Sequence, residues 1–133
     1  MSVPPIRLHT PAGEFFLVLL AALVDLPDRI PSKREVENHI QKAGYLSLPP
    51  EYVTGAYDSK SEAKWKTLLA YARRNAVDRG HIKPLTRRDA WEISDKGRKR
   101  FEELRQKFRD GSIKRTGFEF LSAAFFERLD LDS

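Results

Sequence analysis

One run of ten consecutive apolar residues, Phe15–Val24, constrains the fold of this chain more than any other feature. A helix that spans a bilayer needs about 20 apolar residues, so this run is too short to cross a membrane. Because it is apolar on nearly every side, it predicts a helix buried against more than one other element. Thr10 followed by Pro11 is a typical helix start, so we expect this helix over about 11–25.

The size and composition of the chain indicate one folded domain without a cofactor. Its 133 residues suffice for a single core, and a hydrophobic fraction of 41% argues against intrinsic disorder. The sequence holds no cysteine, which excludes disulfides, thiolate catalysis and cysteine-bound zinc. His9, His39 and His81 lack the spacing of metal ligands. We therefore expect no metal site, no cofactor and a cytoplasmic location.

The positive charge is concentrated in one part of the sequence. Residues 59–109 carry sixteen Lys and Arg against seven Asp and Glu, a net charge of +9, whereas 1–58 and 110–133 are each −2. A block of this kind is compatible with a solvated surface. It also meets the main requirement of a surface that binds a polyanion such as DNA.

Local signals predict two further helices before residue 81. Ser32 and Glu35 have the spacing of a capping box, and Gly44 is suited to the end of the helix that follows. The residues 45–58 lack a sustained period, and we expect an ordered connecting loop. Ser59 with Glu62 repeats the capping-box spacing ahead of the strongest amphipathic stretch, which ends near residue 80.

The remainder of the chain predicts a hairpin and two more helices. Two short β-compatible stretches, 81–85 and 90–93, are joined by a basic turn and are expected to pair. Ser94 or Asp95 is expected to cap the next helix, which an Asp-Gly pair ends. A third capping-box spacing at 116–119 introduces a final helix. Its apolar stripe, which either closes the core or forms a dimer seam, contains Phe118, Leu121, Phe125 and Leu129.

The order of helix, helix, helix, hairpin and helix predicts a mainly α, winged helix-turn-helix domain over 1–110, with an extra C-terminal helix in 111–133. In such folds the third helix enters the major groove, and the hairpin contacts the DNA backbone. The polar face of the third helix supplies most of the candidate DNA contacts. They are Lys60, Lys64, Lys66, Thr67, Tyr71, Arg73 and Arg74 on this helix, Arg87 and Arg88 in the wing, and Arg98 beyond it.

Each of these features also has a purely structural interpretation. Any exposed helix face is polar, so the stripe on the third helix by itself also fits a solvated surface. Trp65 and Trp91 are expected to anchor the core rather than to stack on bases. Tyr45, Tyr52 and Tyr57 are expected to hold their loop against the core, although aromatic residues also line flipped-base pockets.

Part of the sequence resembles the N-terminal winged-helix domain of Mrr-type restriction proteins. The resemblance covers about 11–105, and its specific part runs from Trp65 through Gly80 to the segment Ala-Trp-Glu-Ile-Ser-Asp-Lys-Gly-Arg at 90–98. That family has a tryptophan-led helix, a glycine turn and a strand ending in Trp-x-Ile/Leu-Thr-x-x-Gly-Arg; here Ser94 replaces the usual threonine. The resemblance implies a domain that binds DNA, which a separate nuclease domain cuts.

We therefore expect a DNA-binding module that is not an enzyme, with the target-recognition role in a restriction or defence system that the resemblance implies. The expected partners are duplex DNA, a second copy bound through the C-terminal helix and a separate nuclease subunit, but no membrane. A protein-interaction or dimerisation module is the main alternative. A nuclease is less favoured: the nearest match to its metal site is Asp58 with Glu62 and Lys64, and the last two lie two residues apart on a predicted helix and so face different directions.

Overall fold

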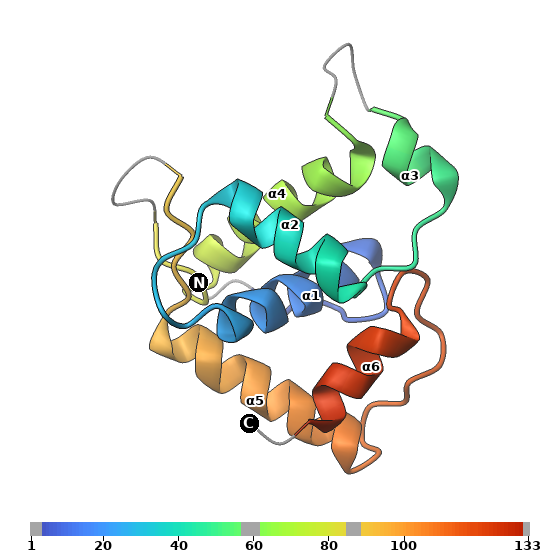
Figure 1. Ribbon diagram of the computed structural model, residues 1–133. Coiled ribbons are helices and arrows are strands. Elements are labelled where there is room, and N and C mark those ends of the chain that lie inside the picture. Colours follow the sequence, from blue (N-terminus) through green and yellow to red (C-terminus); the bar gives the residue numbers. More distant parts are fainter. Residues whose placement is uncertain (1–3, 57–61, 85–88, 132–133) are drawn as a thin grey trace.

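The computed structural model describes residues 4–56, 62–84 and 89–131. Within these ranges the chain folds around the central helix α1 (Figure 1). On one side of α1 lie α2 and α4, and on the other side lies α5, with α6 packed beside it. The helices are α1 (Pro11–Asp25), α2 (Lys33–Ala43), α3 (Pro50–Thr54), α4 (Lys64–Asp78), α5 (Asp95–Arg109) and α6 (Ala123–Asp130).

The helix α1 confirms the prediction drawn from the apolar run. All its residues from Gly13 to Leu23 are buried, because helices pack on both of its sides. The hydroxyl of Thr10 accepts a hydrogen bond from the amide of Gly13 at 3.0 Å and so caps the first turn. Within the described residues, no helix is both long and apolar enough to span a membrane.

Two other helix starts follow the predicted capping signals. Ser32 and Glu35 form the complete capping box of α2, and Gly44 ends that helix with a φ of 70°. The side chain of Ser94 caps α5 by accepting from the amide of Gly97 at 3.0 Å. A Cβ on Gly97 would overlap the carbonyl oxygen of His81, so glycine is needed for this close approach.

Three predictions about helices were wrong. The expected loop at 45–58 contains the short helix α3. The helix α4 begins only at Lys64, after Ala63, which offers no side-chain cap. The last helix does not start at the segment 116–119. Ser122 caps α6 instead, and its hydroxyl accepts a hydrogen bond from the amide of Phe125 at 3.1 Å. Glycine at position 117 has a φ of 86°, which suits a turn rather than a helix start.

The winged helix-turn-helix prediction was also wrong, although the fold is mainly α. The described residues contain no strand, and only an isolated bridge joins Ile82 to Ile93 where the hairpin was expected. Two backbone hydrogen bonds flank this bridge, from the amide of Lys83 to the carbonyl of Glu92 at 2.8 Å and from the amide of Ser94 to the carbonyl of His81 at 3.0 Å, while the amide of Trp91 donates to the carbonyl of Pro31 at 3.0 Å and so ties this segment to the connection before α2. The expected tip, with Arg87 and Arg88, lies outside the described residues.

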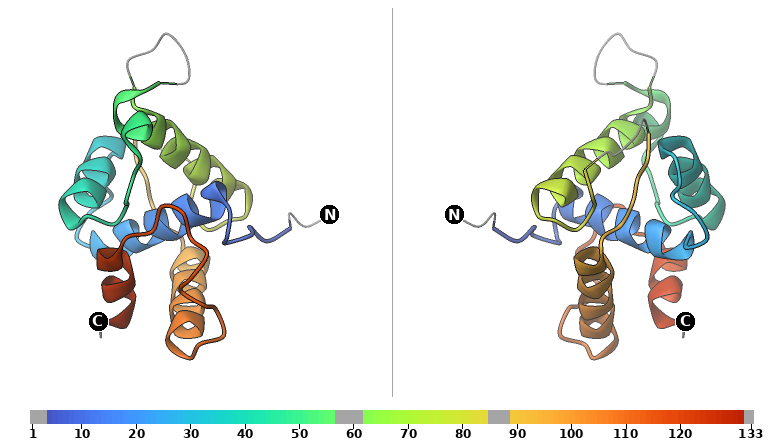
Figure 2. Two further views of the ribbon diagram at one scale, coloured as in Figure 1. Left: turned by 90° about the vertical axis from the view of Figure 1, so that its right-hand side faces the viewer. Right: turned by 90° about the vertical axis from the view of Figure 1, so that its left-hand side faces the viewer.

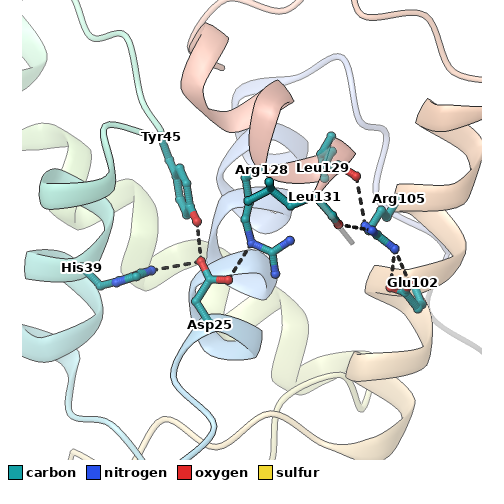
Figure 3. A network of polar contacts seen from close by, with 8 residues as sticks. All are labelled: Asp25, His39, Tyr45, Glu102, Arg105, Arg128, Leu129 and Leu131. Atoms are coloured by element: carbon teal, nitrogen blue, oxygen red, sulfur yellow. Dashed lines mark hydrogen bonds and ion pairs between the residues drawn. The ribbon is translucent and has the colours of Figure 1, made fainter. Parts of the chain in front are cut away.

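The C-terminal helix α6 closes the core of this chain. Phe125 and Leu129 are fully buried. Nearby, the carboxylate of Asp25 at the end of α1 accepts hydrogen bonds from Tyr45 and, at 2.6 Å, from Nε of Arg128, while Nε2 of His39 lies 3.0 Å away (Figure 3). One carboxylate therefore connects α1, α2 and α6.

Candidate nucleic-acid interface

The helix α4 lies along one edge of the molecule and has an exposed outer face (Figure 2). Its inner face buries Trp65 and Leu69 against the core, and Trp65 is only 2% exposed. Tyr71 and Arg74 are three residues apart and so share the opposite face. Arg74 is exposed, and Tyr71 is 58% exposed. These two side chains are available to a partner.

Two predicted contacts, Lys66 and Thr67, are engaged by the protein itself. The hydroxyl of Thr67 donates to the carboxylate of Glu62 at 3.3 Å, and the same carboxylate forms an ion pair with Lys33. The ammonium of Lys66 lies 5.7 Å from the centroid of the Trp65 ring. Their capacity to contact DNA is therefore smaller than the sequence indicated.

The buried carboxylate of Glu37 lies near the same cluster. Its Oε2 has no hydrogen-bond partner among the described residues and is 3.9 Å from Nζ of Lys33. Burial raises the pKa of Glu37, while the charges of Lys33 and Lys66 oppose that shift. Near the start of α4, the positive charges of Lys33 and Lys66 are thus offset by the carboxylates of Glu37 and Glu62.

Arg73 is directed toward the core. Its guanidinium lies 5.6 Å from the centroid of the Trp91 ring, and its Nε is buried without a hydrogen-bond partner among the described residues. Trp91 is only 4% exposed, which confirms that both tryptophans anchor the core. Arg73 therefore joins α4 to the segment before α5.

The structure describes two of the remaining predicted contacts, Arg98 and Lys64. Arg98 lines a pocket of about 160 Å³ together with Pro27, Ile30 and Trp91, beside the connection from α1 to α2. Lys64 is half-buried where α4 starts, and its amide donates to the carbonyl of Gly55 at 2.9 Å. Lys60 lies outside the described residues, as does Tyr57.

The tyrosines of the segment before α4 hold it to the core, as predicted, where the structure describes them. Tyr45 is buried and donates its hydroxyl to Asp25. The ring of Tyr52 lies 5.0 Å from that of Phe120. Both side chains are thus engaged in contacts with the protein itself.

A group of cations gathers where α4 ends and α5 begins. These residues were not among the predicted DNA contacts. The hydroxyl of Ser94 donates to the carbonyl of Gly80 at 2.6 Å, so the two helix ends are held together. A Cβ on Gly80 would lie 3.7 Å from Cδ of Lys96, which places this lysine against the end of α4. The residues concerned are Arg79, Lys96 and Arg100. The four-residue spacing of Lys96 and Arg100 on one helix face was the available signal.

The histidine at this junction is surrounded by positive charge. His81 is 9% exposed, and its Nδ1 has no hydrogen-bond partner among the described residues. Its pKa is lowered by burial first and then by the charges of Lys96, Arg100 and Arg79, while Glu103 acts in the opposite direction. The cations of the junction therefore lie close enough to act on a buried side chain.

Ion pairing separates the cations of the described residues into two groups. Many are neutralised locally, as in the pairs of Arg29 with Glu35 and Arg115 with Asp130. Outside α4 and α5, the described part of the chain has four cations without a carboxylate partner there, and they are scattered: Arg7, Arg34, Lys42 and Lys114. The greater number lie from α4 to the first turns of α5. These cations without a carboxylate partner in the described ranges are Lys66, Arg73, Arg74, Arg79, Lys96, Arg98 and Lys99, and Lys107 near the end of α5 is a further one.

In the part of the chain that the structure describes, no group of three or more His, Asp or Glu side chains is placed to hold a metal ion. The carboxylate of Glu62 is occupied by Lys33 and Thr67.

Comparison with protein families, with curated proteins and with solved structures finds no match to this chain. The resemblance to Mrr-type proteins therefore stays a prediction from the residues that carry it.

Proposed function

We propose that the protein binds duplex DNA through the outer face of α4. The observation that carries this proposal is that the exposed Tyr71 and Arg74 share one helix face inside the segment with a net charge of +9, and that Arg74 has no carboxylate partner among the described residues. An arginine can contact phosphates or bind the edge of guanine with two hydrogen bonds. A tyrosine hydroxyl can donate to a phosphate oxygen.

The dimensions of α4 suit this role. Its 15 residues correspond to about 22 Å of helix, and the major groove, about 12 Å wide, admits an α-helix. Neutralisation of phosphates by Lys and Arg releases counterions from DNA and supplies most of the affinity of such a surface. We propose a binding role rather than catalysis, since the carboxylate of Glu62 is held in protein contacts.

Paired substitutions test the proposal directly. Arg74→Gln and Tyr71→Ala each remove an outward side chain, whereas Lys114→Gln removes an exposed cation from the acidic C-terminal part of the chain. We expect Arg74→Gln to weaken binding to a duplex of about 20 base pairs roughly fivefold to tenfold at about 0.1 M salt. Lys114→Gln should bind as the wild-type protein does. Equal affinities for all three variants and the wild type would place the binding surface elsewhere.

The resemblance to restriction proteins supports a more specific role, target recognition for a separate nuclease. This role requires discrimination between DNA sequences or modification states. The test is competition between methylated and unmethylated duplexes of the same sequence. If Arg74 contacts a guanine edge, Arg74→Gln should narrow the difference between preferred and random DNA by about 1 to 3 kcal/mol. A partner protein lost by the α4 variants, with DNA binding unchanged, would favour a protein-docking role instead.

A further inference from the structure

We propose that the junction of α4 and α5 is a second phosphate-binding surface, in which Lys96 and Arg100, with Arg79, hold the DNA backbone beside α4. This inference rests on the proposed function and deepens it. It assigns phosphate contacts to a region that is separate from Tyr71 and Arg74, and it predicts how far the DNA extends over the protein.

The geometry of the junction is fixed by contacts between the two helix ends. The hydroxyl and the amide of Ser94 bond to the carbonyls of Gly80 at 2.6 Å and of His81 at 3.0 Å. Gly97 lets the backbone of α5 approach His81 without a side chain between them. These contacts hold together the two backbone segments that carry the cations.

The charges at the junction favour an anion. Lys96 is exposed and has no carboxylate partner among the described residues. Arg79 donates to the carbonyls of Pro4 at 2.9 Å and Asn75 at 3.0 Å, contacts that orient its guanidinium without neutralising it. Arg100 has one carboxylate partner, Glu103, at 3.4 Å. The acids of this region are Glu103, Asp95 in the first turn of α5 and the exposed Asp78 at the end of α4. The cations Arg79, Lys96, Lys99 and Arg100 exceed them by one charge.

The position of the junction fits a continuous DNA backbone. Arg74 lies four residues, or about 6 Å of helix, before the end of α4 at Asp78, and Gly80 follows two residues later. Each strand of DNA carries one phosphate per about 3.4 Å of helix axis, so a strand near Arg74 can reach the junction within about three phosphates. Point charges carried by lysine and arginine suit the sequence-independent contacts of the backbone.

The experiment compares the salt dependence of binding to a random duplex of about 20 base pairs for the full chain and its variants. Lys96→Gln and Arg100→Gln remove charge at the junction. Lys107→Gln is the matched control, because Lys107 is an exposed cation near the other end of the same helix. We expect the slope of log affinity against log salt to become less negative by about 1 for Lys96→Gln and by about 2 for the double variant Lys96→Gln with Arg100→Gln. The slope for Lys107→Gln should equal that of the wild type. Lys96→Arg should retain the slope.

The outcomes separate this inference from the proposed function. One outcome would overturn the second surface and leave α4 as the interface. In it the wild type binds DNA, Arg74→Gln makes the salt dependence shallower, and the junction and Lys107 variants have the slope of the wild type. Absence of duplex binding by the wild type would overturn both. Unfolding curves followed by circular dichroism accompany each variant. Since Lys96 is exposed, its replacement should leave the unfolding temperature unchanged.

Discussion

The guanidinium of Arg73 lies over the ring of Trp91, 5.6 Å from the ring centroid, while the next residue, Arg74, is exposed. Adjacent residues on a helix point about 100° apart, so one arginine meets the core and its neighbour meets solvent. The same residue type thus has two roles at consecutive positions. This pair provides a test in which charge and chemistry are identical and only the surroundings differ.

Arg73→Ala should lower the free energy of unfolding by about 1 to 2 kcal/mol, because it removes a cation–π contact and the packing of the arginine stem. Arg74→Ala should leave stability within about 0.5 kcal/mol of the wild type. Chemical denaturation measures both values. Equal stability of the two variants would contradict the assignment of Arg73 to the core.

Glu14→Ala should be strongly destabilising. Its buried carboxylate oxygen Oε1 accepts hydrogen bonds from the amides of Phe120 at 2.7 Å and Leu121 at 3.1 Å. Loss of this acceptor leaves two buried donors unsatisfied, and we expect a cost of about 3 kcal/mol or more. Glu119→Ala, which alters an exposed carboxylate next to the same segment, is the control and should have little effect. Similar unfolding midpoints for both variants would rule out the proposed tie between α1 and the C-terminal segment.

His81 should make the protein less stable in mild acid. Its pKa in the folded protein is lowered by burial and by the cations Lys96, Arg100 and Arg79, against Glu103. The unfolded chain therefore binds more protons at this position, so stability is lost as the pH falls below about 6.5. His81→Gln should show a smaller decrease in unfolding temperature between pH 7.5 and 5.5 than the wild type. An equal decrease in both proteins would contradict this role.

Glu37 should have the opposite pH dependence. Burial raises its pKa above the ordinary value of 4.5, despite Lys33 and Lys66, so the folded protein holds this proton more tightly than the unfolded chain does. Stability contributed by the protonated form is lost as the pH rises from about 4.5 through the folded-state pKa. The stability of Glu37→Gln relative to the wild type should therefore increase between pH 4.5 and 7. If the difference in stability between Glu37→Gln and the wild type did not change with pH, burial would not disfavour the charged carboxylate of Glu37.

Local sequence signals predicted those features of the fold that depend on neighbouring residues. Thr10, Ser32 and Ser94 each cap the expected helix, since a cap needs only its own first turn. Where the hairpin was expected, the described residues form one isolated bridge, and the amide of Trp91 bonds to Pro31, a partner 60 residues earlier in the chain. A pattern of β-compatible residues contains no information about such a long-range contact.

The candidate site was predictable to a similar extent. The periodicity of α4 places Tyr71 and Arg74 on its outer face, as expected. It could not show that Thr67 would meet Glu62, or that Lys96 would lie beside Gly80, because both contacts depend on how separate segments pack. Charge counting found the basic segment, whereas the structure distinguishes its paired cations from its unpaired ones.

The salt dependence of duplex DNA binding by the wild-type protein tests the central claim most directly. With about four to six phosphates contacted, the logarithm of the affinity should fall against the logarithm of salt concentration with a slope of about −4 to −5. Measurement over about 50 to 200 mM salt covers the range in which this change is large. A slope near zero, or no binding at about 50 mM salt, would contradict a DNA-binding role for the surface formed by Tyr71 and Arg74.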